Sequence, residues 1–140
     1  MSVLAHLYVS TPDKALEYDE SQEAPENERA ELKGLTYIEF STLWAIAEGK
    51  DWEEDHMDSF EVLLEKDHGE RMIFRCPDAF VALAAGLDDA AVTEAAEEWA
   101  ETDELEDWEP EDLTEVIEEL RRVARVAKLG KRGLYLWNCV

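Results

Sequence analysis

The sequence predicts an α+β fold that is mostly helical, with a small sheet built from the two ends of the chain. The first and last stretches, residues 2–9 and 133–140, are apolar and rich in β-tending residues. Between them, several segments carry helix caps or apolar residues at helical spacing. With 140 residues, 46% of them hydrophobic, the chain has the length and apolar content of one core, so we expect residues 1–140 to form a single domain.

The first strand is followed by a polar cap. Ser10-Thr11-Pro12 places proline at a first helical position and predicts a short helix that runs through Tyr18. Residues 19–33 contain almost no apolar side chains. We therefore expect a mobile acidic loop at about 19–33.

The clearest local signal lies at residues 36–49. Thr36 and Glu39 have the spacing of a capping box, and Leu35 and Phe40 that of a hydrophobic staple. Gly49 is a typical helix stop. The pattern predicts a helix from Tyr37 to Glu48.

Residues 52–66 fit two structures. Trp52, His56 and Phe60 keep a helical spacing, which favours a helix followed by a turn. The alternative is a hairpin, in which residues 60–64 pair with a strand at 71–76 across Lys66-Asp67-His68-Gly69. In either case a strand near 71–76 is expected.

Three further helices complete the pattern. Pro77 suits the first turn of one helix that ends at Gly86, and Asp88 caps the next. Pro110 opens the longest, in which apolar residues recur at i, i+3, i+4 and i+7 as far as Ala127. The final strand, 133–140, is expected to lie beside the first, because each strand alone would leave an apolar sheet edge with unpaired backbone groups.

Charge is the chain's most uneven property. Residues 1–120 hold all 36 acidic residues and seven of the 13 basic ones, a formal charge of −29, whereas residues 121–140 carry +6. Such a surface repels nucleic acid and anionic membranes and attracts basic proteins. The basic residues after position 120 fit the last turns of the long helix, where arginines can pair with acidic side chains elsewhere in the fold. Salt adaptation is another explanation, in which the charge carries no partner information.

Composition also predicts the compartment. No window has the roughly 18–20 apolar residues of a membrane span, and the N-terminus lacks the basic region of a signal peptide. Cys76 and Cys139 lie in apolar stretches that favour free thiols. We expect a cytoplasmic protein.

No motif indicates catalysis or a cofactor. The sequence has no G-x-S-x-G, no phosphate-binding glycine loop and no calcium-binding loop. His56 and His68 each follow an aspartate, so with nearby carboxylates they could bind a metal or small molecule, with or without catalysis. A solvent-facing pair is the alternative. His6, on an apolar strand, is expected to be a satisfied core or sheet-face residue.

Tryptophans flanked by acids are the best candidates for a binding face. The candidate residues lie in two stretches, 51–58 and 101–112: Trp52, Glu53, Glu54, Asp55, Trp108 and Glu109. An exposed tryptophan ringed by carboxylates can anchor a basic protein, with the charges steering its approach. The alternative is that both tryptophans pack inward at helix starts.

Four stretches together resemble small acidic bacterial proteins of unknown function: the opening strand with Ser-Thr-Pro, RCPDAFVALAAGLDD, EEWAETDEL and GKRGLYLWNCV. The resemblance implies an α+β fold and a bacterial cytoplasmic origin, and it brings no catalytic residues. The sequence thus favours a non-enzymatic, immunity- or inhibitor-like domain that docks a basic protein and needs no cofactor. It does not indicate the oligomeric state.

Overall fold

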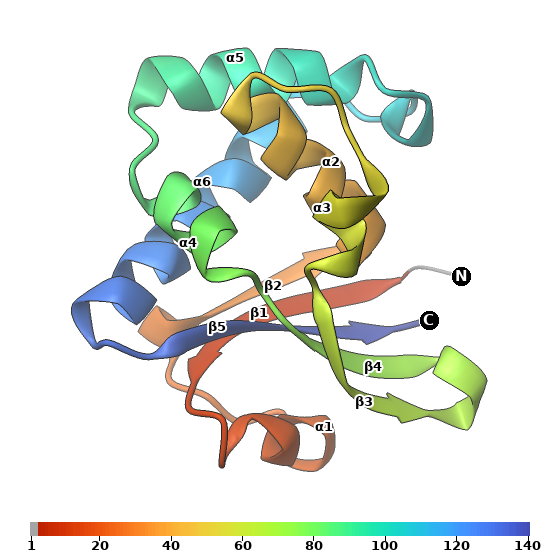
Figure 1. Cartoon of the computed structure of the whole chain (residues 1–140), viewed down its shortest axis with the longest axis vertical. Coiled ribbons are helices and arrows are strands. Elements are labelled where there is room, and N and C mark those ends of the chain that lie inside the picture. The colour runs from red at the N-terminus through yellow and green to blue at the C-terminus, as the bar shows by residue number, and fades with distance from the viewer. Residues whose placement is uncertain (1–2) are drawn as a thin grey trace.

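One antiparallel sheet forms the centre of the computed structural model, which describes residues 3–140 (Figure 1). Its spatial order is β2-β1-β5-β4-β3. The strands are β1 (Leu4–Ser10), β2 (Arg29–Lys33), β3 (Glu61–Lys66), β4 (Arg71–Arg75) and β5 (Gly133–Cys139). Leu4 lies opposite Cys139 on neighbouring strands, so the prediction that both ends of the chain share one sheet is confirmed. Ser2 of the predicted first strand lies outside the described residues.

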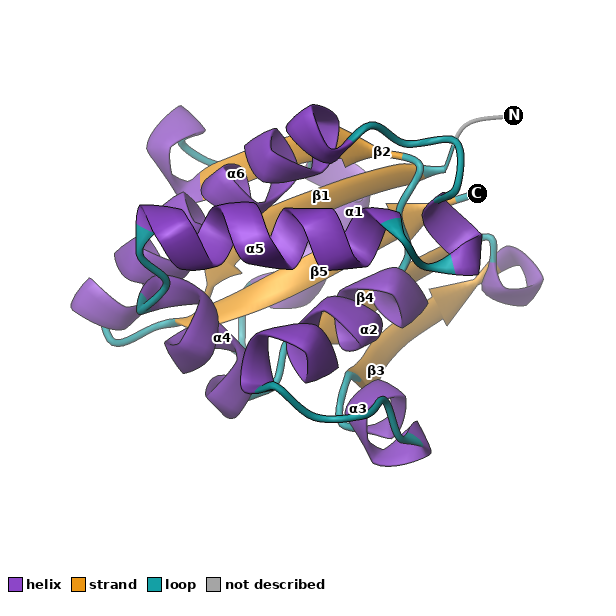
Figure 2. Ribbon diagram, turned by 90° about the horizontal axis from the view of Figure 1, so that it is seen from above, coloured by secondary structure: helices purple, strands orange, loops and turns teal. Residues whose placement is uncertain are grey.

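Helices account for most of the remaining chain. Over residues 3–140 the α-helices are α1 (Tyr18–Ser21), α2 (Tyr37–Glu48), α3 (Glu54–Asp58), α4 (Asp78–Ala85), α5 (Asp89–Ala100) and α6 (Pro110–Leu129). α6 packs on β1, β2 and β5, and α5 packs on α6 and α2. Figures 1 and 2 show α2, α4, α5 and α6 over one face of the sheet and α1 on the other. The mostly helical α+β fold is confirmed.

The strands alternate between the two faces. On β1, Leu7 and Val9 point into the main core under the helices, while His6 and Tyr8 point to the opposite face. α6 contributes seven buried residues to the main core: Leu113, Val116, Ile117, Leu120, Val123, Ala124 and Ala127. Each fully buried leucine, isoleucine or valine contributes about 1.5–3 kcal/mol, so this helix holds much of the fold together.

The cap predicted at Ser10-Thr11-Pro12 does not form, because the first helical turn begins at Ala15, after Lys14, with no side-chain cap. Two other predicted caps form. The Thr36–Glu39 capping box begins α2, and the Asp88 side chain accepts from the Ala91 N–H at the start of α5. α6 begins at Pro110 and ends before Gly130. The three helices predicted from caps and periodicity are confirmed.

Two regions differ from the favoured expectation. After the short α3, residues 61–75 form the β3–β4 hairpin, so the hairpin alternative is right and a helix through residue 66 is wrong. Residues 29–33 form strand β2 rather than loop, because they pair with β1 and bury Ala30. Whether the rest of 19–33 is mobile stays a prediction.

A membrane span is not found among the helices of residues 3–140, none of which is long and apolar enough to cross a bilayer.

Candidate functional site

The site is built at the C-terminal end of α2. Gly49 ends this helix in the left-handed conformation (φ 72°), and its N–H donates to the carbonyls of Ala45 and Ile46. The Lys50 N–H also donates to the Ala45 carbonyl, at 3.0 Å. The chain therefore turns sharply here and leaves Glu48 facing the segment that leads into α3.

His56 joins this segment to α2. Its Nδ1 accepts from the Glu53 N–H at 3.0 Å, and its Nε2 lies 2.8 Å from Glu48 Oε1. Because Nδ1 accepts, Nε2 carries the proton that is donated to Glu48. His56 is buried, and its ring lies edge-on to the indole of Trp44, with centroids 5.0 Å apart. Both ring nitrogens are therefore occupied by the protein.

A depression of about 580 Å³ opens beside this pair. We call it the acidic bay, and it is lined by Trp44, Glu48, Gly49, Lys50, Asp51, Glu53, Asp55, His56 and Ser59. Within residues 3–140, no basic group lies within 4.0 Å of a carboxylate oxygen of Asp51, Glu53 or Asp55. All three residues are exposed. The lining of the bay thus carries four carboxylates, of which Glu48 is bonded to His56, and one basic side chain, Lys50.

Trp52 lies between two residues of the bay lining. Its side chain is 41% exposed, and its indole N–H donates to Ser41 Oγ at 3.0 Å. The hydrogen bond holds the ring in place while a large part of its surface faces solvent. Of the two predicted tryptophan anchors, Trp52 has the geometry of an exposed one. Its predicted neighbour Glu54 is exposed on α3, outside the lining.

Trp108 has the inward-packing geometry instead. It is partly buried and packs against the main core. Gly34 (φ 79°) lies directly under its ring, where a Cβ would come 2.9 Å from Cζ2. Glu109 is exposed at the start of α6. Trp108 thus serves the fold, and its position leaves Glu109 without an aromatic anchor.

The two predicted stretches do not form one site. Gly34 beneath Trp108 precedes α2, whereas the Glu48 that binds His56 is its last residue. The lining of the bay contains no residue of 101–112, although Trp52 reaches Ser41 in the first half of α2.

The two candidate metal-binding histidines also lie apart. His56 is in α3, before β3, and His68 is exposed in the turn after β3. Six residues of strand, at about 3.3 Å each, separate them. No group of three or more His, Cys, Asp or Glu side chains in residues 3–140 is arranged to hold a metal ion.

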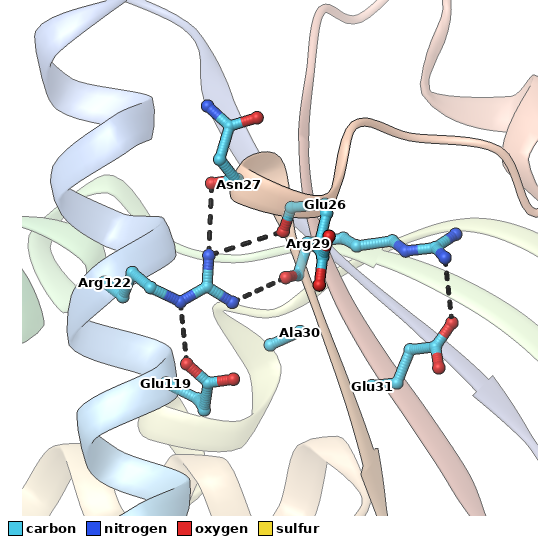
Figure 3. Close-up of a pocket in the computed structure, with 7 residues that line it drawn as sticks. All are labelled: Glu26, Asn27, Arg29, Ala30, Glu31, Glu119 and Arg122. Carbon is cyan, nitrogen blue, oxygen red and sulfur yellow. Dashed lines mark hydrogen bonds and ion pairs between the residues drawn. The ribbon is translucent and has the colours of Figure 1, made fainter.

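In a second depression, of about 830 Å³, the basic side chains are bound by the protein itself (Figure 3). Arg122 donates to the carbonyls of Asn27 and Arg29 at 3.2 and 2.7 Å and to Glu119 at 2.7 Å. Arg29 pairs with Glu31 at 3.3 Å. These contacts fasten edge strand β2 to α6, and they occupy the charges that a ligand would need. The acid that pairs with Arg122 lies on the same helix, and the predicted pairing with an acid elsewhere in the fold is made by Arg121, with Asp89 at 2.9 Å.

The opposite face of the sheet holds a buried polar cluster. Asp19, whose side chain is 1% exposed, lies 3.0 Å from Lys66 Nζ and 3.3 Å from Arg71. It also accepts from the Trp137 indole at 3.0 Å. Burial raises the pKa of Asp19, but these three neighbours outweigh it and the net pKa is lowered. The cluster ties α1 to the β3–β4 hairpin.

His6 belongs to the same face and is buried, as expected. Its Nδ1 lies 2.8 Å from the Tyr18 hydroxyl. Burial lowers the pKa of His6, against the opposing charge of Glu31. Cys76 and Cys139 are both free, and burial raises the pKa of the Cys76 thiol, which makes it a poor nucleophile.

Comparison with known proteins returned no match among protein-family models, curated proteins or solved structures. The resemblance to small acidic bacterial proteins therefore stays a prediction, and the site is interpreted from its own geometry.

Proposed function

We propose that this chain is a non-enzymatic, immunity- or inhibitor-like domain of the bacterial cytoplasm that docks a basic protein through the acidic bay and Trp52. The observation that carries the proposal is the pairing of a depression lined mostly by carboxylates, three of which form no ion pair within residues 3–140, with an exposed, fixed indole. Aromatic anchors within a charged rim are typical of binding hot spots.

The fold's own basic groups leave this charge available. Arg121, Arg122 and Arg132 form ion pairs with Asp89, Glu119 and Glu28. Between Arg75 and Arg121 the sequence has 17 acidic residues and no lysine or arginine. With a net charge of −23, the whole molecule attracts a basic partner, and the bay with Trp52 provides a place where short-range contacts can form.

Salt-dependent capture tests this proposal. The immobilised wild-type protein should capture a basic protein from lysate of its host at about 50 mM salt and lose most of it at about 500 mM, because steering and rim charges are screened. The triple variant Asp51→Asn, Glu53→Gln, Asp55→Asn should capture much less.

A charge-matched control separates the bay from general acidity. The variant Glu97→Gln, Glu98→Gln, Glu101→Gln removes the same charge from the α5 region. It should keep most of the capture. Failure to find any salt-sensitive basic protein, or equal loss in both triple variants, would contradict the proposal.

A further inference from the structure

A short strap covers one face of the sheet. We call residues 15–21 the α1 strap, and it lies on the opposite face from α2, α4, α5 and α6 (Figure 1). α1 itself is a single turn of four residues, too short to be stable alone, so contacts with the sheet keep the strap in place. Together they form the second core, whose buried members are Tyr8, Ala15, Tyr18, Ile73, Tyr135 and Trp137.

Polar contacts fix the strap at both of its ends. The Tyr8 hydroxyl donates to the Ala15 carbonyl at 2.6 Å, and the Tyr8 ring stacks on that of Tyr18, with centroids 4.1 Å apart. The Tyr18 hydroxyl lies 2.8 Å from His6 Nδ1. The ion pairs of Asp19 with the β3–β4 hairpin fasten the other end.

His6 is a titratable group beneath the strap. It is 8% exposed, and its ring lies between Tyr18 of α1 and Trp137 of β5, with centroids 5.9 and 4.8 Å away. A neutral ring fits this site through its hydrogen bond with Tyr18. A proton would add a positive charge where water has little access, which is unfavourable, and burial accordingly lowers the pKa of His6.

The acidic side chains that face His6 are already paired. Glu31 lies opposite His6 on β2 and pairs with Arg29 at 3.3 Å. Asp19 on α1 lies within 3.3 Å of two basic side chains of the hairpin. Glu31 raises the pKa of His6 and Arg29 lowers it, and burial, which is the largest effect, decides the direction. A protonated His6 is therefore poorly balanced while the strap is closed.

We propose that the strap is an acid-sensitive lid, which opens more often as pH falls from about 7 to 5 because a protonated His6 is well hydrated only when residues 15–21 lift from the sheet. Lifting costs less than unfolding, because β1 keeps its pairing with β2 and β5 and the main core lies on the other face. The open state brings the rings of Tyr8 and Trp137 into contact with solvent.

The direction and size of the pH effect follow from the two states of His6. Its pKa is ordinary, about 6.5, when the strap is open and lowered when the strap is closed. The advantage of the closed state is therefore fully present above pH 6.5 and is lost as pH falls through the lowered value. Between pH 7.5 and 5.0 the opening equilibrium rises by up to about 30-fold. The lowered pKa of Asp19 keeps its ion pairs intact over this interval.

Hydrogen exchange of two buried indoles, followed by NMR, tests the lid. The Trp137 N–H donates to Asp19 of the strap at 3.0 Å, and the Trp99 N–H donates to the Glu39 carbonyl in the main core at 3.1 Å. The two indoles have the same chemistry, so their ratio cancels the intrinsic pH dependence of exchange. Between pH 7.5 and 5.0 the protection of Trp137 should fall about 5- to 30-fold, and that of Trp99 less than about 2-fold.

The variant His6→Gln has a neutral side chain that can still form a hydrogen bond with Tyr18. It should abolish the pH dependence of the Trp137-to-Trp99 ratio. The matched variant His68→Gln removes an exposed histidine from the hairpin turn and should leave that dependence unchanged. Circular dichroism at pH 7.5 checks that both variants fold. Direct NMR titration of the imidazoles in the wild-type protein tests the same idea without a variant, and the midpoint of His6 should lie below that of His68.

Four results would overturn the proposal. They are equal losses of protection at the two indoles, an unchanged ratio in the wild-type protein, the same pH dependence in folded His6→Gln, and a His6 midpoint at or above that of His68. Equal losses would mean that acid loosens the whole fold and that the strap has no separate motion.

Discussion

Single carboxylates in this chain have two different surroundings. Asp19 is buried and lies within 3.3 Å of two basic side chains, whereas Asp51 and Asp55 are exposed and form no ion pair with any residue from 3 to 140. Charge count alone cannot distinguish them, because both kinds stand in similar acidic stretches. Only the packing of α1 against the sheet makes Asp19 structural.

The variant Asp19→Asn should destabilise the fold by about 1–3 kcal/mol at pH 7, because it removes the charge that Lys66 and Arg71 face. The Trp137 N–H keeps an acceptor in the amide. Asp67→Asn is the control, since Asp67 pairs with Arg71 but is 60% exposed, and it should cost less than about 1 kcal/mol. Urea unfolding measures both.

The same pair of variants has a defined pH dependence. The pKa of Asp19 is lowered in the folded state, so its contribution is present above the unfolded value of about 3.9 and is lost as pH falls through the folded pKa. The stability difference between wild type and Asp19→Asn should hold from pH 7 to pH 5 and shrink below pH 4. A difference that grew in acid would contradict this account.

The variant Trp52→Ala should weaken partner binding by about 1–2 kcal/mol, roughly 5- to 30-fold, because it removes the exposed ring beside the bay. Leu129→Ala is the control, since Leu129 is 87% exposed in the last turn of α6. Calorimetric titration with the captured partner should show no loss for that variant. Equal losses would mean that Trp52 has no special role.

At the scale of elements, the glycine that ends α2 shapes the bay. Gly49 has φ 72°, and an added Cβ there would meet nothing within 4 Å, so the cost of Gly49→Ala is conformational, about 1 kcal/mol or more. Gly86 has negative φ, and Gly86→Ala should be neutral or stabilising by up to about 1 kcal/mol. Urea unfolding should therefore place the stability of Gly49→Ala below that of wild type and the stability of Gly86→Ala at or above it.

Elements with strong local signals could be predicted from the sequence. α2 and α5 have side-chain caps, and α6 begins at a proline and buries apolar residues at a helical spacing that no strand would have. β2 could not be predicted, because Ala30 is its one fully buried residue and its strand character comes from pairing with β1. At β3, Phe60 and Leu63 also fit a helical spacing, so the local pattern allows both a helix and a strand. The long-range pairing with β4 decides in favour of the strand.

The site could be predicted only in part. Proximity to acids pointed to both Trp52 and Trp108, but burial of Trp108 over Gly34 depends on contacts 74 residues apart in sequence. The role of His56 had a local signal, because it stands three residues after Glu53, where a helix-capping side chain is found. Its bond to Glu48 depends on the turn at Gly49.

At the scale of the whole molecule, the fold should tolerate low salt. Its bases are distributed among ion pairs across α6, β2 and the hairpin, and its core is large and apolar. We expect cooperative unfolding at 50 mM salt, with a modest rise in stability toward 1 M as self-repulsion is screened. Loss of the folded state below molar salt, followed by circular dichroism, would instead support salt adaptation.

The central claim is that the short-range contacts with a basic partner are made at one place, the acidic bay, although the whole surface attracts that partner. Calorimetric titration with the captured partner, at about 50 and 500 mM salt, tests this claim most directly. The proteins compared are wild type, the bay variant Asp51→Asn/Glu53→Gln/Asp55→Asn and the α5 variant Glu97→Gln/Glu98→Gln/Glu101→Gln. The account predicts at least a tenfold loss of affinity for the bay variant and less than a threefold loss for the α5 variant at low salt. Equal losses in the two variants, which have the same net charge, would contradict it.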